Sequence, residues 1–171
     1  MKNIFLVILT SSIFLIFGSA FAGEKYEFTG TAYNTSGFEA PIVTASEAQI
    51  WNWSNDSFWI YDDAPEGWPK EVMADCKGKG IANKDGIPLA GFFMCTVHDT
   101  DGDLFLTSGN WEPSKGGGDW TFISGTGKFE GVTGGGSYLN GVQFMGGDTL
   151  NFVTSIAVSY THLTLPTTEY V

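Results

Sequence analysis

The sequence contains no arginine and little positive charge of any kind. Its eight basic residues are all lysines, against 19 aspartates and glutamates, and the formal net charge is -11. Nucleic-acid binding needs a basic surface and favours arginine forks, so this composition argues against it. The lack of arginine also removes the usual bidentate clamp for phosphate and carboxylate groups. We therefore expect no nucleic-acid partner.

Histidine is scarce as well. Apart from His162 near the C-terminus, His98 is the sole histidine, which excludes a histidine-rich metal site. No G-x-S-x-G nucleophile turn accompanies it. The acidic run Asp99, Asp101 and Asp103 lacks the glycine and glutamate positions of an EF-hand loop, so we interpret it as a solvated turn. We predict no catalytic residues, no metal and no cofactor.

The first 22 residues have the pattern of a secretory signal peptide. Lys2 supplies the positive region, an apolar run follows over 4–17, and Ala20-Phe21-Ala22 forms a small-x-small cleavage site. The run is shorter than the ~20 apolar residues that cross a bilayer. We expect cleavage after Ala22, a periplasmic or extracellular location, and no membrane span in the mature chain.

Residues 158–171 resemble the translation of a transposon-end adaptor used in making sequencing libraries. The alternative is an ordinary terminal strand, because the segment is rich in threonine, valine and tyrosine. We favour the adaptor. The predicted organisation is therefore a signal peptide (1–22), a single domain (23–157) and a tail that is not native (158–171).

The mature domain has the pattern of an all-β protein. Glycine (23 residues) and aromatics (15%) are abundant in the full sequence, and most segments of the mature domain alternate apolar and polar residues between glycine-rich breaks. This alternation with period two is typical of antiparallel strands, and turn signals at this spacing are typical of a small sandwich or barrel.

Two Asp-Gly pairs predict consecutive hairpins. We expect two-residue type I′ turns at Asp85-Gly86 and at Asp101-Gly102, with both turn residues at positive φ. The first turn would place Cys76 opposite Cys95 in a hydrogen-bonded pair, and export would permit a disulfide there. The second would place His98 opposite Phe105. Consecutive hairpins imply an antiparallel meander that closes into a barrel of about eight strands.

The last third of the chain is dense in glycine. Gly125, Gly127 and Gly131 would allow a tight corner with positive φ, and Phe129 could plug the barrel end. Residues 118–138, which contain this G-T-G-x-F-x-G run, resemble the corner of allene oxide cyclase and dirigent-like barrels, above all small exported bacterial members without an assigned activity. The resemblance covers about 73–152 and implies a barrel. No catalytic motif carries over with it.

An aromatic cluster marks candidate ligand-binding residues. Trp51 and Trp53 share one strand face, as do Trp59 and Tyr61. Such residues can form barrel core, or they can line a cavity for an apolar or sugar ligand. The two interpretations overlap, because an eight-stranded barrel is just wide enough for one small ligand. We predict that these four residues bind the ligand.

Three functions remain open from the sequence. The first is an exported, non-catalytic barrel that binds a small, mostly apolar ligand. The second is an allene-oxide-cyclase-like isomerase or a dirigent-type protein, which a polar group beside an open cavity would favour. The third is a surface interaction module, which a filled barrel would favour.

Asn34, Asn52 and Asn55 also form glycosylation sequons, which matter only in a eukaryotic source. The oligomeric state is left open.

Overall fold

The computed structural model describes residues 24–146 and 148–162. The predicted signal peptide and residues 163–171 of the predicted tail lie outside this part. Among the described residues, no helix is long and apolar enough to cross a membrane. The elements are β1 (Glu24–Phe38), β2 (Ile42–Val43), β3 (Gln49–Asp62), β4 (Glu71–Ala82), β5 (Pro88–His98), β6 (Leu104–Trp111), η1 (Pro113–Lys115), β7 (Gly117–Gly125), η2 (Gly127–Phe129), β8 (Thr133–Gly146) and β9 (Thr149–His162).

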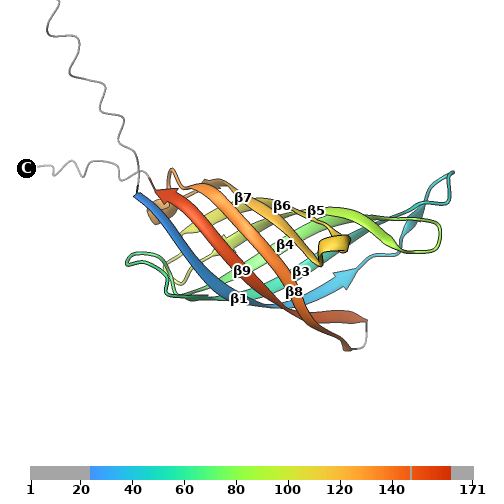
Figure 1. Ribbon diagram of the computed structural model, residues 1–171, viewed down its shortest axis with the longest axis horizontal. Coiled ribbons are helices and arrows are strands. Elements are labelled where there is room, and N and C mark those ends of the chain that lie inside the picture. Colours follow the sequence, from blue (N-terminus) through green and yellow to red (C-terminus); the bar gives the residue numbers. More distant parts are fainter. Residues whose placement is uncertain (1–23, 147, 163–171) are drawn as a thin grey trace, which may run out of the picture.

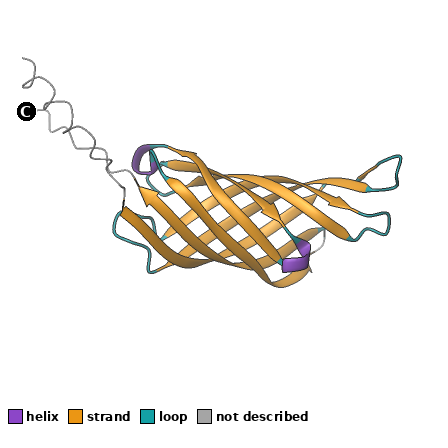
Figure 2. Ribbon diagram, turned by 45° about the horizontal axis from the view of Figure 1, so that its top comes forward, coloured by secondary structure: helices purple, strands orange, loops and turns teal. Residues whose placement is uncertain are grey.

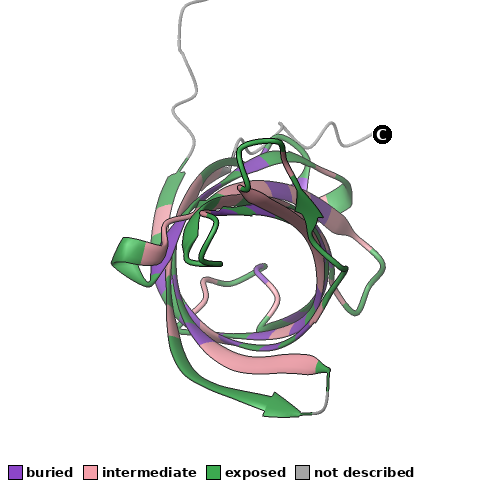
Figure 3. Ribbon diagram, turned by 90° about the vertical axis from the view of Figure 1, so that its right-hand side faces the viewer, coloured by how far each residue is buried: buried purple, intermediate pink, exposed green. Residues whose placement is uncertain are grey.

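The strands form a closed antiparallel barrel (Figures 1 and 2). The order around the sheet is β1-β9-β8-β7-β6-β5-β4-β3, and pairing between β1 and β3 closes the ring, while β2 adds only to the end of β3. A view along the barrel shows the ring (Figure 3). The predicted all-β meander with eight barrel strands is confirmed.

The two hairpin loops differ from the predicted type I′ turns. Gly86 and Gly102 have positive φ (76° and 91°), but Asp85 and Asp101 do not. Each loop has three residues between its closing pair, because the N–H of Asn83 donates to Ile87 O, and that of Asp99 donates to Asp103 O, both at 3.0 Å. The type I′ prediction is therefore wrong.

The side chain of the residue just before each loop explains the wider turn. Asn83 Oδ1 accepts hydrogen bonds from the N–H groups of residues 85 and 87, and Asp99 Oδ1 accepts them from residues 101 and 103, at 2.9–3.0 Å. In such Asx turns the side-chain oxygen accepts hydrogen bonds from backbone N–H groups of the loop. In a two-residue turn, backbone carbonyls across the hairpin would have to accept them instead. The equivalent asparagine and aspartate thus specify the same loop twice.

The wider loops change the register of one hairpin but not of the other. His98 lies opposite Leu104 rather than Phe105. In the first hairpin, a bulge that leaves Leu89 unpaired restores the alignment, so Cys76 does lie opposite Cys95 and the two are joined in a disulfide. Their Cα atoms are 4.0 Å apart, which fits a non-hydrogen-bonded pair and not the predicted hydrogen-bonded one.

Strand β9 continues five residues past the predicted end of the domain. Residues 158–161 pair with both β1 and β8, residue 162 pairs with β1, and Val158 and Tyr160 are buried in the core. These residues therefore take part in the fold. That they derive from an adaptor stays a prediction.

Aromatic side chains fill the barrel end that holds the chain's β3–β4 connection, which we call the closed end. The connection folds back under the barrel so that the Trp68 ring lies 4.4 Å from Tyr160 and 5.2 Å from Phe129, measured between ring centroids. The closed-end cluster comprises Phe28, Tyr61, Trp68, Phe105, Phe122, Phe129 and Tyr160.

The predicted glycine corner supports this cluster. Gly127 and Gly131 have positive φ (51° and 75°), as expected, whereas Gly125 does not. Gly125 is constrained in another way, because a Cβ there would lie 2.3 Å from the carbonyl oxygen of Phe129. The corner thereby holds Phe129 in the barrel with only 1% of its surface exposed.

Candidate ligand pocket

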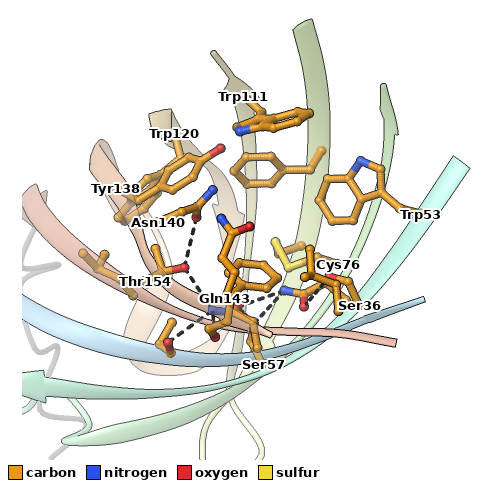
Figure 4. Close-up of a pocket in the computed structure, with 18 of the residues that line it drawn as sticks. Ser36, Trp53, Ser57, Cys76, Trp111, Trp120, Tyr138, Asn140, Gln143 and Thr154 are labelled. Carbon is orange, nitrogen blue, oxygen red and sulfur yellow. Dashed lines mark hydrogen bonds between the residues drawn. A yellow bond between two sulfur atoms is a disulfide. The ribbon is translucent and has the colours of Figure 1, made fainter. Parts of the chain in front are cut away.

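The other end of the barrel, which we call the open end, contains a cavity of about 370 Å³ (Figure 4). All eight barrel strands contribute to its lining. Its floor lies where the closed-end cluster stops, and its mouth lies between the loops at the opposite end. Exposed apolar side chains stand near this mouth, including Phe38, Val142 and Phe144.

Aromatic and glycine residues alternate around the cavity wall. As cross-strand partners from β3 to β8, one level of the barrel carries in turn Trp53, Gly78, Phe93, Gly109, Trp120 and Gly136. The next level toward the mouth pairs Trp51 with Gly80 and Gly91 with Trp111.

The glycines let the rings lie against the wall. A Cβ at Gly78 would lie 2.2 Å from the Trp53 ring, and one at Gly109 would lie 2.3 Å from the Phe93 ring. Any side chain at these positions would push the rings into the lumen. Glycine in a strand commonly marks such a close approach, and here the approach keeps the cavity open.

Three of the four predicted binding residues line the cavity. Trp51, Trp53 and Trp59 do, whereas Tyr61 lies one step deeper on β3 and packs against Phe28 in the closed end, with ring centroids 5.2 Å apart. Burial raises the pKa of Tyr61 above its ordinary value.

Two further tryptophans were missed by the sequence interpretation. Trp111 and Trp120 also line the cavity, so five of the six tryptophans surround it. Each lies in a segment whose residues alternate in the pattern of a strand, Trp111 in β6 and Trp120 in β7. The alternation could have placed each of them on the inward face of its strand.

Six neutral polar side chains form the floor and lower wall, and sequence analysis did not identify them as a group. Within the described part of the chain, these are the buried residues with a neutral, non-aromatic polar side chain, and every one lines the cavity: Asn34, Ser36, Asn55, Ser57, Thr107 and Thr154. Asn34 and Asn55 appeared in the sequence only as sequons. The available signal was polar residues on the inward face of strands that are otherwise aromatic.

Hydrogen bonds lock most of this floor in place (Figure 4). Asn34 Nδ2 donates to Thr154 Oγ1 at 3.0 Å, and Asn34 Oδ1 accepts from Asn55 Nδ2 at 3.0 Å and from the Ser57 hydroxyl. The Ser36 hydroxyl donates to Asn55 Oδ1 at 3.0 Å. The amides and hydroxyls thus satisfy one another without any ionic group.

The cavity carries no charge near neutral pH. No Asp, Glu, Lys or His side chain among the described residues lines it. The one titratable lining group in that part is Tyr138, whose hydroxyl donates to Asn110 O at 2.9 Å. Burial, reinforced by the negative charges of Asp119 and Glu112, raises the pKa of Tyr138 above its ordinary value. His98 is exposed and takes no part in the cavity.

The acidic turn at the closed end holds a lysine. Lys128 Nζ lies 2.7 Å from Asp99 Oδ2 and 2.5 Å from Asp101 Oδ2. Hydrogen bonds to Asp101 and Asp99 raise the pKa of Lys128. Burial of Asp99 opposes its ionisation, but hydrogen bonds from Lys128 and from the backbone N–H groups of residues 101 and 103 prevail and lower its pKa. These two ion pairs connect η2, which contains Lys128, to the β5–β6 loop, which contains Asp99 and Asp101.

Comparison with known proteins adds no family assignment. No family model matches the chain, and no curated protein matches it either. The resemblance to allene oxide cyclase and dirigent-like barrels therefore stays a prediction, and the geometry of the cavity is the basis for the functional argument.

Proposed function

We propose that the protein is an exported, non-catalytic barrel that binds a small, mostly apolar ligand in the open-end cavity. The observation that carries this proposal is the cavity itself, at about 370 Å³ with aromatic walls. Pockets for small molecules commonly enclose about 300–1,000 Å³ and combine apolar walls with a few polar groups. The cavity is at the small end of this range of pocket volumes, so its ligand should be small.

The driving force would be the removal of apolar surface from water. A cavity of this volume corresponds to about a dozen water molecules at ~30 Å³ each, and its lining surface is mostly apolar. A ligand that displaces them gains about 25 cal/mol for each Å² of apolar surface buried. The disulfide and the locked floor keep the site formed before binding, which limits the entropy lost on association.

The lining groups favour binding over acid–base catalysis. General acid–base chemistry needs a group whose pKa lies near the working pH. Of the described residues that line the cavity, Tyr138 alone titrates, and its pKa is raised away from neutrality. The lining therefore supports recognition better than proton transfer.

One observation favours a second candidate. Buried amides and hydroxyls lie beside an open cavity, which is the arrangement expected for the cyclase-type or dirigent-type alternative. Such a protein could steer a reactive guest without transferring a proton. The test is the stereochemistry of ring closure of an allene oxide generated in the presence of the protein. An excess of one enantiomer would support this candidate, and a racemic product would oppose it.

Fluorescence titration with the neutral dye phenylnaphthylamine tests binding directly. Energy transfer from the cavity tryptophans should accompany saturable dye emission, because five tryptophans line the site. Asn140 lines the cavity, so Asn140→Phe should block the dye. The matched control is Leu139→Phe, which places the same side chain on the adjacent, exposed position of β8 and should leave binding unchanged. Absence of saturable binding, or equal binding by both variants, would contradict the proposal.

Export has its own test. Expression of the full chain in a bacterium, followed by cell fractionation and N-terminal sequencing, should give a periplasmic protein that begins at Gly23. Recovery of the intact N-terminus from the cytoplasm would contradict the exported location without affecting the binding proposal.

A further inference from the structure

The cavity has two chemically different sides. The hydrogen-bonded polar residues lie on the neighbouring strands β3, β1 and β9. On the opposite side of the eight-stranded ring, four strands from β1, β6 contributes Thr107, whose neighbours across the strands are Cys95 and Phe122. Thr107 is therefore a single hydroxyl set among sulfur and aromatic groups.

Thr107 differs from the other polar residues of the floor in having no partner. Its side chain is 1% exposed, and its Oγ1 makes no hydrogen bond within the described structure. A buried hydroxyl without a partner is costly, by an amount similar to the gain from one good hydrogen bond. Thr107 lines the cavity but its Oγ1 is covered, so a ligand atom supplies the missing partner once the Thr107 side chain turns its hydroxyl toward the cavity.

The surrounding electrostatics restrict which ligand atom this can be. No charged side chain from the described residues lines the cavity, so a carboxylate or ammonium group would be buried without a counter-ion, which is strongly unfavourable. The net charge of -11 adds repulsion for anions. A neutral hydroxyl or carbonyl oxygen avoids both costs and can bond to a threonine hydroxyl.

We infer that the cavity selects uncharged, mono-oxygenated apolar molecules, whose single hydroxyl or carbonyl oxygen bonds to Thr107 Oγ1 while the apolar body lies against the tryptophans. This inference rests on the proposed binding function and adds the ligand class. Thr107 is then the residue that distinguishes an oxygenated ligand from a hydrocarbon of the same shape.

A matched series of naphthalene, naphthol and naphthoate tests the inference by competition with bound phenylnaphthylamine. The three compounds share one ring system and differ in having no oxygen, a neutral hydroxyl or a charged carboxylate. Naphthol should compete about tenfold better than naphthalene, as expected for one net hydrogen bond, and naphthoate should compete least. Equal competition by naphthol and naphthalene, or strongest competition by naphthoate, would overturn the inference.

Substitutions at Thr107 assign the effect to this hydroxyl. Thr107→Val should remove the preference for naphthol and leave naphthalene unaffected, without lowering the melting temperature, because the lost hydroxyl had no partner. Thr107→Ser keeps the hydroxyl and should keep the preference. Thr96 lies on the neighbouring strand β5, directly after Cys95, and does not line the cavity. Thr96→Val therefore makes the same chemical change outside the cavity and should behave like the wild type.

The outcomes separate this inference from the proposed function. If Thr107→Val keeps the naphthol preference, the assignment of that preference to Thr107 is wrong. If the dye binds the wild type but naphthol and naphthalene compete equally, the ligand class is wrong and apolar binding stands. If neither the dye nor any competitor binds the wild-type protein, the proposed function fails, and the ligand class fails with it.

Discussion

The two ends of the barrel use the same kind of residue in opposite ways. At the closed end, aromatic rings pack on one another, as in the pair Phe105 and Phe129 with ring centroids 4.9 Å apart. At the open end, aromatic rings pack on glycine, as Trp53 does on Gly78. In these two examples, the group that a ring packs on differs between the ends: another ring where the lumen is filled, and a glycine where the ring lines a space.

This difference also separates the main source of stability from the site of the proposed function along one short barrel. Aromatic–aromatic contacts at the closed end bury apolar surface from every direction, which is the main favourable contribution to folding. The open end leaves Trp51, Trp53 and Trp111 partly exposed and keeps a group of polar side chains out of water, which contributes less. The closed end can therefore support the open end, whose surfaces remain available to a ligand.

The largest effect should come from removing an aromatic ring at the closed end. Phe129→Ala should lower the free energy of unfolding by about 3–5 kcal/mol, because the ring is fully buried and its site is held by backbone that cannot collapse. Trp53→Ala at the open end should cost less than half as much, because its ring already borders a cavity, but it should weaken dye binding. Urea denaturation with dye titration measures both. Equal loss of stability in the two variants would contradict the division between the ends.

The disulfide joins β4 and β5 at the level where the two ends meet. Replacing Cys76 and Cys95 together with alanine should lower the free energy of unfolding by about 3 kcal/mol, the chain-entropy value for a loop with a sequence separation of 19. A reducing agent should destabilise the wild type by a similar amount and leave the double variant unchanged. If mass spectrometry finds two free thiols in protein recovered from the periplasm, the predicted pairing is absent in the cell.

The cysteine pairing was predicted correctly although the structure differs from the predicted hairpin in two ways, because the two differences shift the register in opposite directions. The assumed two-residue turn is in fact a three-residue loop, which alone would have shifted the register by one. The bulge at Leu89 shifts it back. In the second hairpin the loop has the same form but no bulge follows, so His98 faces Leu104 and the predicted register fails. Bulges depend on tertiary packing and have no reliable signature in a single sequence.

Depth along the barrel was the part of the site that sequence could not supply. Trp59 and Tyr61 share one face of β3, and the alternation with period two treats them alike. Their separation into cavity wall and core is decided by how far the β3–β4 connection folds back and where Trp68 comes to lie. The buried amides were missed for a related reason, because an asparagine in a strand reads as exposed until the barrel closes around it.

A matched pair of glycine substitutions sharpens the comparison between the ends. Gly125→Ala places a Cβ 2.3 Å from a backbone oxygen, which cannot move aside, so the free energy of unfolding should fall by about 1–3 kcal/mol. Gly78→Ala places a Cβ 2.2 Å from the Trp53 ring, which can swing into the cavity, so stability should change by less than about 1 kcal/mol.

The two glycine variants should also differ in their affinity for the dye, and here the larger effect should come from Gly78→Ala. Gly78→Ala should weaken phenylnaphthylamine binding, because the displaced ring occupies the lumen, whereas Gly125→Ala should leave the affinity of the folded protein unchanged. A Gly78→Ala variant that binds the dye as well as the wild type would show that the glycine is not needed to keep the cavity open.

The smallest effect concerns the ion pair at the closed end and depends on pH. The pKa of Asp99 is lowered in the folded protein despite its burial, so the carboxylate contributes stability above the ordinary aspartate pKa of 3.8, and this contribution is lost as the pH falls through the lowered value. Asp99→Asn keeps the Asx turn, because Asn83 forms the same loop in the neighbouring hairpin. The variant should lose only the attraction to Lys128, about 1 kcal/mol or less near neutral pH. Urea denaturation should show the gap between the two proteins closing as the pH falls below about 4, with dye affinity equal throughout, because the turn lies away from the cavity. A gap that stays constant or widens in acid would mean that Asp99 acts through the turn and not through its charge.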